Sequence, residues 1–137
     1  MMRSKELAAK LYLANAVVLI THEIDSAYWH EWELLQLPGG IQFFLLLHIV
    51  LIGVVLHGFR SVVLWANSAR LYSYLLASLG ILAFLIHGSF LLTGAPQFRS
   101  PISLALLSAT LILSLSQLVV VRGCHDTARN EHKKKRR

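Results

Sequence analysis

Three long stretches of the chain contain no Asp, Glu, Lys or Arg: residues 34–59, 71–98 and 100–121. Each stretch exceeds the roughly 20 mostly apolar residues that a membrane-spanning helix needs. Charged residues make up only 15% of the 137 residues, whereas about 25% is typical of a soluble domain. A soluble helical protein of this length could bury one such segment but hardly three, so the stretches predict membrane helices.

A fourth span is expected near the N-terminus, where residues 11–21 are uncharged but too few to cross a membrane alone. Extension to residues 7–27 gives a spanning length, and Lys10 can reach one surface by snorkelling. A cleaved signal peptide is the alternative interpretation. Because no small-residue cleavage site follows the apolar segment and acidic residues come directly after it, a retained helix is preferred.

These segments together predict an all-α, polytopic membrane protein with one domain, a bundle of four transmembrane helices over residues 1–122. The expected helices cover residues 7–27, 41–62, 71–92 and 101–122. Pro38-Gly39-Gly40 and Ser100-Pro101 are typical of the boundaries before the second and fourth helices. Residues 123–137 form a basic tail that is expected to be disordered. Such a tail beside a membrane helix is more typical of topology control or contact with anionic lipid than of nucleic-acid binding, so no nucleic-acid partner is expected.

The basic residues are biased toward one side of this arrangement. Every Lys and Arg except Arg99 falls on the side of the two termini and of the loop between the second and third helices. The positive-inside rule then predicts that both termini lie in the cytoplasm. The loops at residues 28–40 and 93–100 are accordingly expected to face outward.

Most of the acidic residues gather at the outer end of the first helix. The segment HEIDSAYWHEWE, which begins at His22, holds four of the seven Asp and Glu of the chain and two histidines. At about 100° per residue, a helix that continued through the whole segment would put His22, Glu23, His30 and Glu33 on one broad face. The same geometry would turn Glu31 away from that face.

Two further helices bring a histidine to a similar depth. With a rise of about 1.5 Å per residue, His22, His48 and His87 each lie about one to two turns inside the outer boundary. Imidazole and carboxylate groups ligate transition metals, and two histidines can ligate a haem. The pattern therefore predicts a transition-metal or haem site. Its expected ligands are His22, Glu23, His48 and His87, with Asp25, His30 and Glu33 as secondary candidates near its mouth.

Two other functions remain open for the same residues. His22 and Glu23 could act as the catalytic acid and base of a membrane-embedded enzyme that works without a metal on a lipid-like substrate. Alternatively, the segment could dock a membrane-protein partner or a second copy of the chain, as in a non-catalytic subunit. For His48 taken alone, a hydrogen bond to a neighbouring helix is the favoured interpretation.

The stretch HEIDSAYWHEWELLQLPGGIQFFLLLH, residues 22–48, resembles the signature stretch of a family of small bacterial integral membrane proteins of unknown function. The resemblance covers mainly the end of the first helix, the outer loop and the start of the second helix. It implies a four-helix protein of about this size in the bacterial inner membrane. It implies no activity and no site residues.

Overall fold

The computed structural model of the protein describes residues 2–94 and 99–135, with side chains described for residues 4–94 and 99–124. Over these residues the chain forms five α-helices. They are α1 (Met2–Tyr28), α2 (Glu31–Leu34), α3 (Gly40–Val63), α4 (Ala69–Leu92) and α5 (Pro101–Lys135).

Four of the described helices are long and apolar enough to cross a membrane. The candidate spans are Ser4–Tyr28, Gly40–Val63, Ala69–Leu92 and Pro101–Cys124. The prediction of an all-helical chain with four membrane-spanning helices is therefore confirmed. The α2 helix has only four residues and lies between the first two spans.

The last helix is longer than the sequence predicted. The prediction placed its end near residue 122 and a disordered tail after it, whereas α5 runs to Lys135. The sequence between Gly123 and Lys135 contains no glycine or proline that would stop a helix, and its second half holds the strong helix formers Ala128, Arg129, Glu131, Lys133, Lys134 and Lys135. Residues 136–137 of the predicted tail lie outside the described residues.

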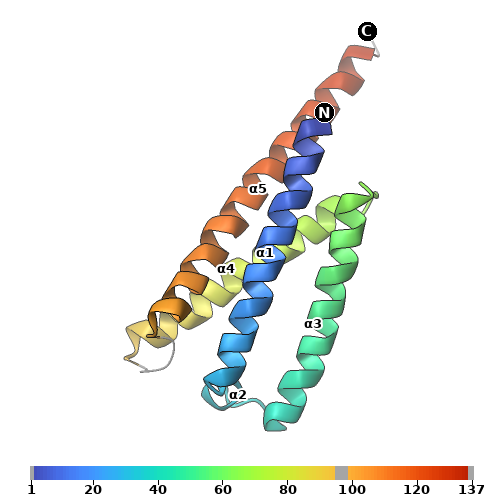
Figure 1. The fold of residues 1–137 in the computed structure, drawn as a ribbon. Helices are drawn as coiled ribbons and strands as arrows, with labels where there is room; N and C mark the ends of the chain where they lie inside the picture. Colours follow the sequence, from blue (N-terminus) through green and yellow to red (C-terminus); the bar gives the residue numbers. More distant parts are fainter. Residues whose placement is uncertain (1, 95–98, 136–137) are drawn as a thin grey trace.

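The helices are arranged so that the start of α1 and the end of α5 lie at one end of the bundle and α2 lies at the other (Figure 1). The α5 helix packs against both α1 and α4, and α3 packs against α1 and α4. The ends of α1 and α4 and the starts of α3 and α5 therefore meet at the α2 end. The residues that the sequence placed at the outer boundary belong to this end.

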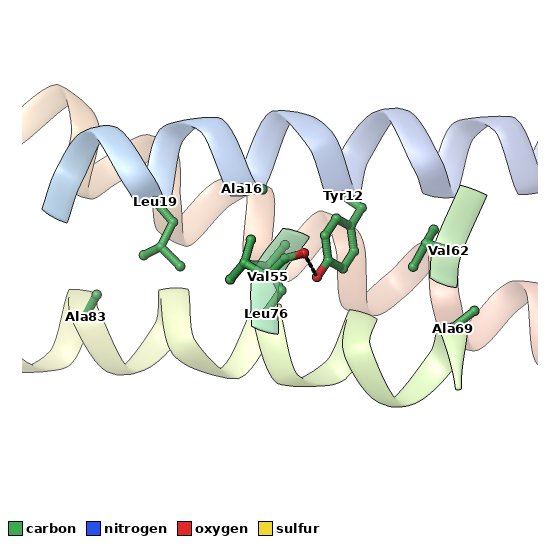
Figure 2. Close-up of a cluster of buried hydrophobic side chains, with 8 residues drawn as sticks. All are labelled: Tyr12, Ala16, Leu19, Val55, Val62, Ala69, Leu76 and Ala83. Carbon is green, nitrogen blue, oxygen red and sulfur yellow. Dashed lines mark hydrogen bonds between the residues drawn. The ribbon is translucent and has the colours of Figure 1, made fainter. Parts of the chain in front are cut away.

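Small and apolar side chains from α1, α3 and α4 form the core, as Figure 2 shows. The hydroxyl of Tyr12 crosses the core and donates a hydrogen bond of 2.9 Å to the backbone carbonyl of Val55. Gly58 permits this close packing, because a Cβ atom there would lie 2.9 Å from the Cβ of Tyr72. The absence of a side chain at Gly58 thus lets α3 approach its neighbours, as small residues do between membrane helices.

A polar cluster joins α1, α4 and α5 in the interior. The amide nitrogen of Asn15 donates to the side-chain oxygen of Gln117 at 2.9 Å and lies 3.2 Å from Oγ of Ser114. Gln117 in turn donates to the backbone carbonyl of Ser73 at 2.9 Å. Polar groups inside a membrane bundle require such internal partners, so this cluster fixes how the three helices face one another.

Candidate functional site

The first helix ends within the acidic segment of residues 22–33, before its last two glutamates. This break in the helix decides which side chains of the segment point inward. The α1 helix ends at Tyr28, and His30 has φ 55° and ψ 47°, in the left-handed region. This conformation is uncommon for a residue with a side chain. The chain changes direction there and resumes as α2, so the helical face predicted for residues 22–33 does not extend past Tyr28.

The break corrects the predicted positions of three side chains, His30, Glu31 and Glu33. His30 and Glu33, which the continuous helix placed beside His22, are exposed. Glu31, which the same helix turned away, is only 6% exposed and lies against His87. The reason is geometric: after a left-handed residue the rotation of about 100° per residue no longer carries over from α1.

His87 is the centre of a buried hydrogen-bonded group. Its Nε2 atom lies 3.2 Å from Oγ of Ser26 and 3.5 Å from Oε1 of Glu31. Its Nδ1 atom lies 2.9 Å from the carbonyl oxygen of Ala83 and 3.3 Å from Nε2 of His22. Side chains of α1, α2 and α4 therefore converge on one imidazole, and this group is the His22–His87–Glu31 network.

The surrounding atoms determine where the protons of this network lie. A carbonyl oxygen only accepts, so Nδ1 of His87 carries a hydrogen that it donates to Ala83. Nε2 of a neutral His87 then accepts, and the hydroxyl of Ser26 at 3.2 Å is the donor. When His87 is an imidazolium, Nε2 donates instead to the hydroxyl of Ser26, and the carboxylate of Glu31 at 3.5 Å supplies the opposite charge. A proton on His87 or on Glu31 is thus stabilised by the other group, but its transfer across the 3.5 Å between them requires the two side chains to approach or Ser26 to bridge them.

A second His–Glu pair links α1 to α3. Nε2 of His48 lies 2.7 Å from Oε2 of Glu23, a distance typical of a charge-assisted hydrogen bond. Nδ1 of His48 lies 2.7 Å from the carbonyl oxygen of Phe44. Both side chains are largely buried, with exposed fractions of 11% for His48 and 17% for Glu23.

The two pairs share one construction. In each, Nδ1 of the histidine donates to the carbonyl four residues earlier in its own helix, which fixes the ring and leaves Nε2 for a glutamate. For His48 that glutamate comes from α1, and for His87 it comes from α2. The site therefore contains two oriented imidazole–carboxyl pairs at one end of the bundle.

Burial shifts the acid–base behaviour of Glu31, which lies between the spans. Removal of its carboxyl from water raises its pKa above the ordinary value of 4.5, and the charge of nearby Glu23 raises it further. His87 and the hydrogen bond from Ser26 act in the opposite direction. Because burial is the largest of these effects, Glu31 retains its proton at a higher pH than an exposed glutamate does.

Two polar atoms of α1 at this end are buried without a hydrogen-bond partner among the described residues. They are Nδ1 of His22 and Oδ2 of Asp25. When the single hydrogen on Nδ1 of His87 is shared between the carbonyl of Ala83 and Nε2 of His22, a neutral His22 carries its own hydrogen on Nδ1. A buried donor and a buried acceptor left unpaired each cost about 1–3 kcal/mol.

The four predicted metal ligands are brought together as two pairs. His22 contacts His87, and Glu23 contacts His48. Among the described residues, no group of three or more His, Cys, Asp and Glu is arranged to hold a metal ion. The sequence reasoning missed Glu31 and Ser26, because no glycine or proline marks the break at His30 and the residue pattern of α1 gives no sign of it.

Four apolar, membrane-length helices define the protein as a multi-pass membrane protein. The chain belongs to the family of unknown function DUF6713, which matches residues 8–124 and so covers the last three spans and all of the first except its first four residues. The prediction of a family of unknown function is confirmed at this level. No curated protein and no solved structure matches the chain.

Proposed function

We propose that this membrane protein performs acid–base chemistry, and that its His22–His87–Glu31 network takes up and passes on a proton at the α2 end of the bundle. The observation that carries the proposal is the burial of Glu31 against Nε2 of His87. Ionisable groups at membrane depth are costly, and those that are retained are typical of proton relays and binding sites.

The contacts of the two ring nitrogens of His87 support an order for the proton transfer. Ser26 and Glu31 meet one nitrogen of His87, and His22 lies near the other nitrogen. An imidazole that accepts a proton at one nitrogen can release one from the other, so His87 suits the middle position of the relay. The His48–Glu23 pair lies beside this network as a second acceptor of protons from the same end.

Infrared difference spectroscopy of the purified protein between acidic and neutral pH tests the proposal. We expect a carboxylic-acid band from Glu31 whose loss accompanies a change in the histidine bands. The band should disappear in Glu31→Gln and persist in the matched control Glu33→Gln, because Glu33 is exposed on the same short helix. Histidine bands that change with pH in the same way in wild type and Glu31→Gln would contradict a shared proton.

A metal or haem site is the second candidate, and one observation favours it. Nδ1 of His22 and Oδ2 of Asp25 are buried ligand atoms without a hydrogen-bond partner among the described residues. The hydrogen bonds of Nε2 of His48 to Glu23 and of Nε2 of His87 to Ser26 oppose it, since those bonds occupy nitrogens that a metal would need. A visible absorption spectrum with elemental analysis of the detergent-purified protein decides between the two. A stoichiometric transition metal or a haem band that is lost in His22→Ala would favour this candidate.

The proposal also includes a location, the bacterial inner membrane with both termini in the cytoplasm. The distribution of basic residues supports this orientation, since Arg60 and Arg70 flank the loop at the terminal end and Arg99 lies beyond the other end of α4. Fusion of a fluorescent protein and of a periplasmic phosphatase to the C-terminus provides the test. Fluorescence without phosphatase activity is the expected result.

A further inference from the structure

A cleft of about 230 Å³ lies at the terminal end of the bundle, far from the histidine network. Its walls come from three helices and one turn: Ala8 of α1, the α3–α4 turn at residues 65–67, Ala69, Arg70 and Ser73 of α4, and Val121 and Cys124 of α5. The α3–α4 turn is held by backbone bonds, such as that from the N–H of Ala66 to the carbonyl of Ser61 at 2.9 Å. The cleft therefore lies where three spans reach the membrane boundary.

The charge of the cleft is positive. Arg70 lines it, and no Asp or Glu stands among the described residues that do so. A second cation lies beside the rim, because Nζ of Lys5 is 4.9 Å from the centroid of the Trp65 ring. Lys10, by contrast, is neutralised by Glu6 at 2.7 Å. An arginine at a partly enclosed space that no carboxylate of the described residues lines is suited to an anion, and its planar guanidinium matches phosphate oxygens.

The remaining walls of the cleft are apolar or amphipathic. Ala8, Ala69 and Val121 are buried side chains that meet the cleft, and the indole of Trp65 borders it. An inorganic anion would make no apolar contact with these walls. A lipid, by contrast, has a phosphate that can bind the arginine and an adjoining apolar part that can contact the walls. Basic pockets between helices at a membrane surface bind anionic headgroups by this combination.

We propose that this cleft binds the phosphate headgroup of an anionic membrane lipid, with Arg70 as the principal contact and Lys5 and Trp65 at the rim. The shared chemistry, a phosphate held by Arg70, would also suit a soluble phosphate compound. The matched control is available in the chain, because Arg60 is an exposed arginine at the same end of the bundle that does not line the cleft. General attraction of lipid to a basic surface would depend on both arginines equally.

Native mass spectrometry of the full-length protein in a neutral detergent provides the test, with phosphatidylglycerol, phosphatidylcholine and inorganic phosphate as separate probes. We expect wild type and Arg60→Gln to retain phosphatidylglycerol in preference to phosphatidylcholine. Arg70→Gln should lose roughly tenfold or more in affinity, the equivalent of one charge-assisted hydrogen bond. Circular dichroism establishes that each variant is folded.

A second variant keeps the test decisive if Arg70→Gln does not fold. Ala66→Leu narrows the cleft from an exposed position of the turn and leaves Arg70 in place, and it should also weaken binding of phosphatidylglycerol. Equal losses in Arg60→Gln and Arg70→Gln would overturn the proposal in favour of a non-specific surface. Binding of inorganic phosphate that depends on Arg70, without preference for phosphatidylglycerol, would overturn it in favour of a soluble ligand.

Discussion

The imidazole of His87 and the carboxyl of Glu31 meet at 3.5 Å, although 56 positions separate them in the sequence (87 − 31) and Glu31 belongs to a helix of only four residues. The short α2 helix covers the end of the bundle and buries its first carboxyl over the histidine of α4. This contact suggests what α2 does in the structure. The short helix places the carboxyl of Glu31 against the imidazole of His87, which belongs to a membrane-spanning helix.

The stability of the protein should depend on pH through Glu31. Its pKa is raised in the folded state, so the folded protein binds a proton that the unfolded chain releases above the ordinary value of 4.5. The free energy of unfolding should therefore fall as pH rises from that value through the folded pKa, because the native state binds more protons over this range. Unfolding in detergent at a series of pH values measures the slope.

Glu31→Gln should remove most of this fall, and Glu33→Gln should leave it unchanged. The charged or titratable groups that face Glu31 are Glu23 from α1, His48 from α3 and His87 from α4. All three groups are present in both variants and serve as an internal reference. A slope in Glu31→Gln equal to that of wild type would assign the pH dependence to those groups instead.

Removal of His87 should destabilise the bundle more than removal of any exposed histidine. His87→Ala leaves Glu31 and Ser26 buried without their shared partner, and loss of one member of a buried pair costs about 3–5 kcal/mol. His57, which is exposed at the other end of α3, is the control. His57→Ala removes an edge contact with the ring of Tyr72, so it should lower the free energy of unfolding by no more than about 1.5 kcal/mol. Similar losses in both variants would mean that the network contributes nothing to stability.

The membrane fold could be predicted from the sequence because its physical cause is local. A long apolar stretch without charges is stable only if its whole length is removed from water. Three such stretches, residues 34–59, 71–98 and 100–121, can be recognised in the sequence alone. The α3 and α4 helices begin and end within two residues of the predicted limits. The end of α5 was not predictable in this way, since the polarity of the sequence changes near Arg122 but no glycine or proline stands between Gly123 and Lys135 to stop the helix.

The candidate site was predictable only in part. The depth of His22, His48 and His87 follows from helix rise, and the three do lie toward the α2 end. Their partners depend on rotation about the helix axes and on the left-handed conformation of His30, which no residue in the segment dictates. When helical periodicity is extended through such a break, residues that face inward are predicted to face outward, and the reverse. The sequence therefore predicted Glu33 on the inner face and Glu31 on the outer one, whereas the structure buries Glu31 and exposes Glu33.

The close approach of α3 to the core should depend on one glycine. Gly58→Ala places a methyl group 2.9 Å from Cβ of Tyr72, which can move only if the helices separate. Such overpacking costs about 1–3 kcal/mol. Gly53 lies in the same helix, and a methyl group there would have no neighbouring atom of the described residues within 4 Å. Gly53→Ala should therefore be neutral or should stabilise the protein by up to about 1 kcal/mol. Equal effects at the two positions would show that α3 does not pack as closely as the structure indicates.

The polar cluster of the interior should act as a specific connection between α1 and α5. Asn15 is fully buried and donates to Gln117 at 2.9 Å, so a double-mutant cycle with Asn15→Ala and Gln117→Ala should show coupling of about 0.6–1.7 kcal/mol. The control cycle combines Asn15→Ala with Ser116→Ala. Ser116 is the neighbour of Gln117, and its hydroxyl donates to the carbonyl of Ile112 in its own helix. That second cycle should show coupling near zero. Coupling of the same size in both cycles would indicate a general loosening of α5 rather than a direct bond, and the register of α1 against α5 would then have to be fixed by apolar packing.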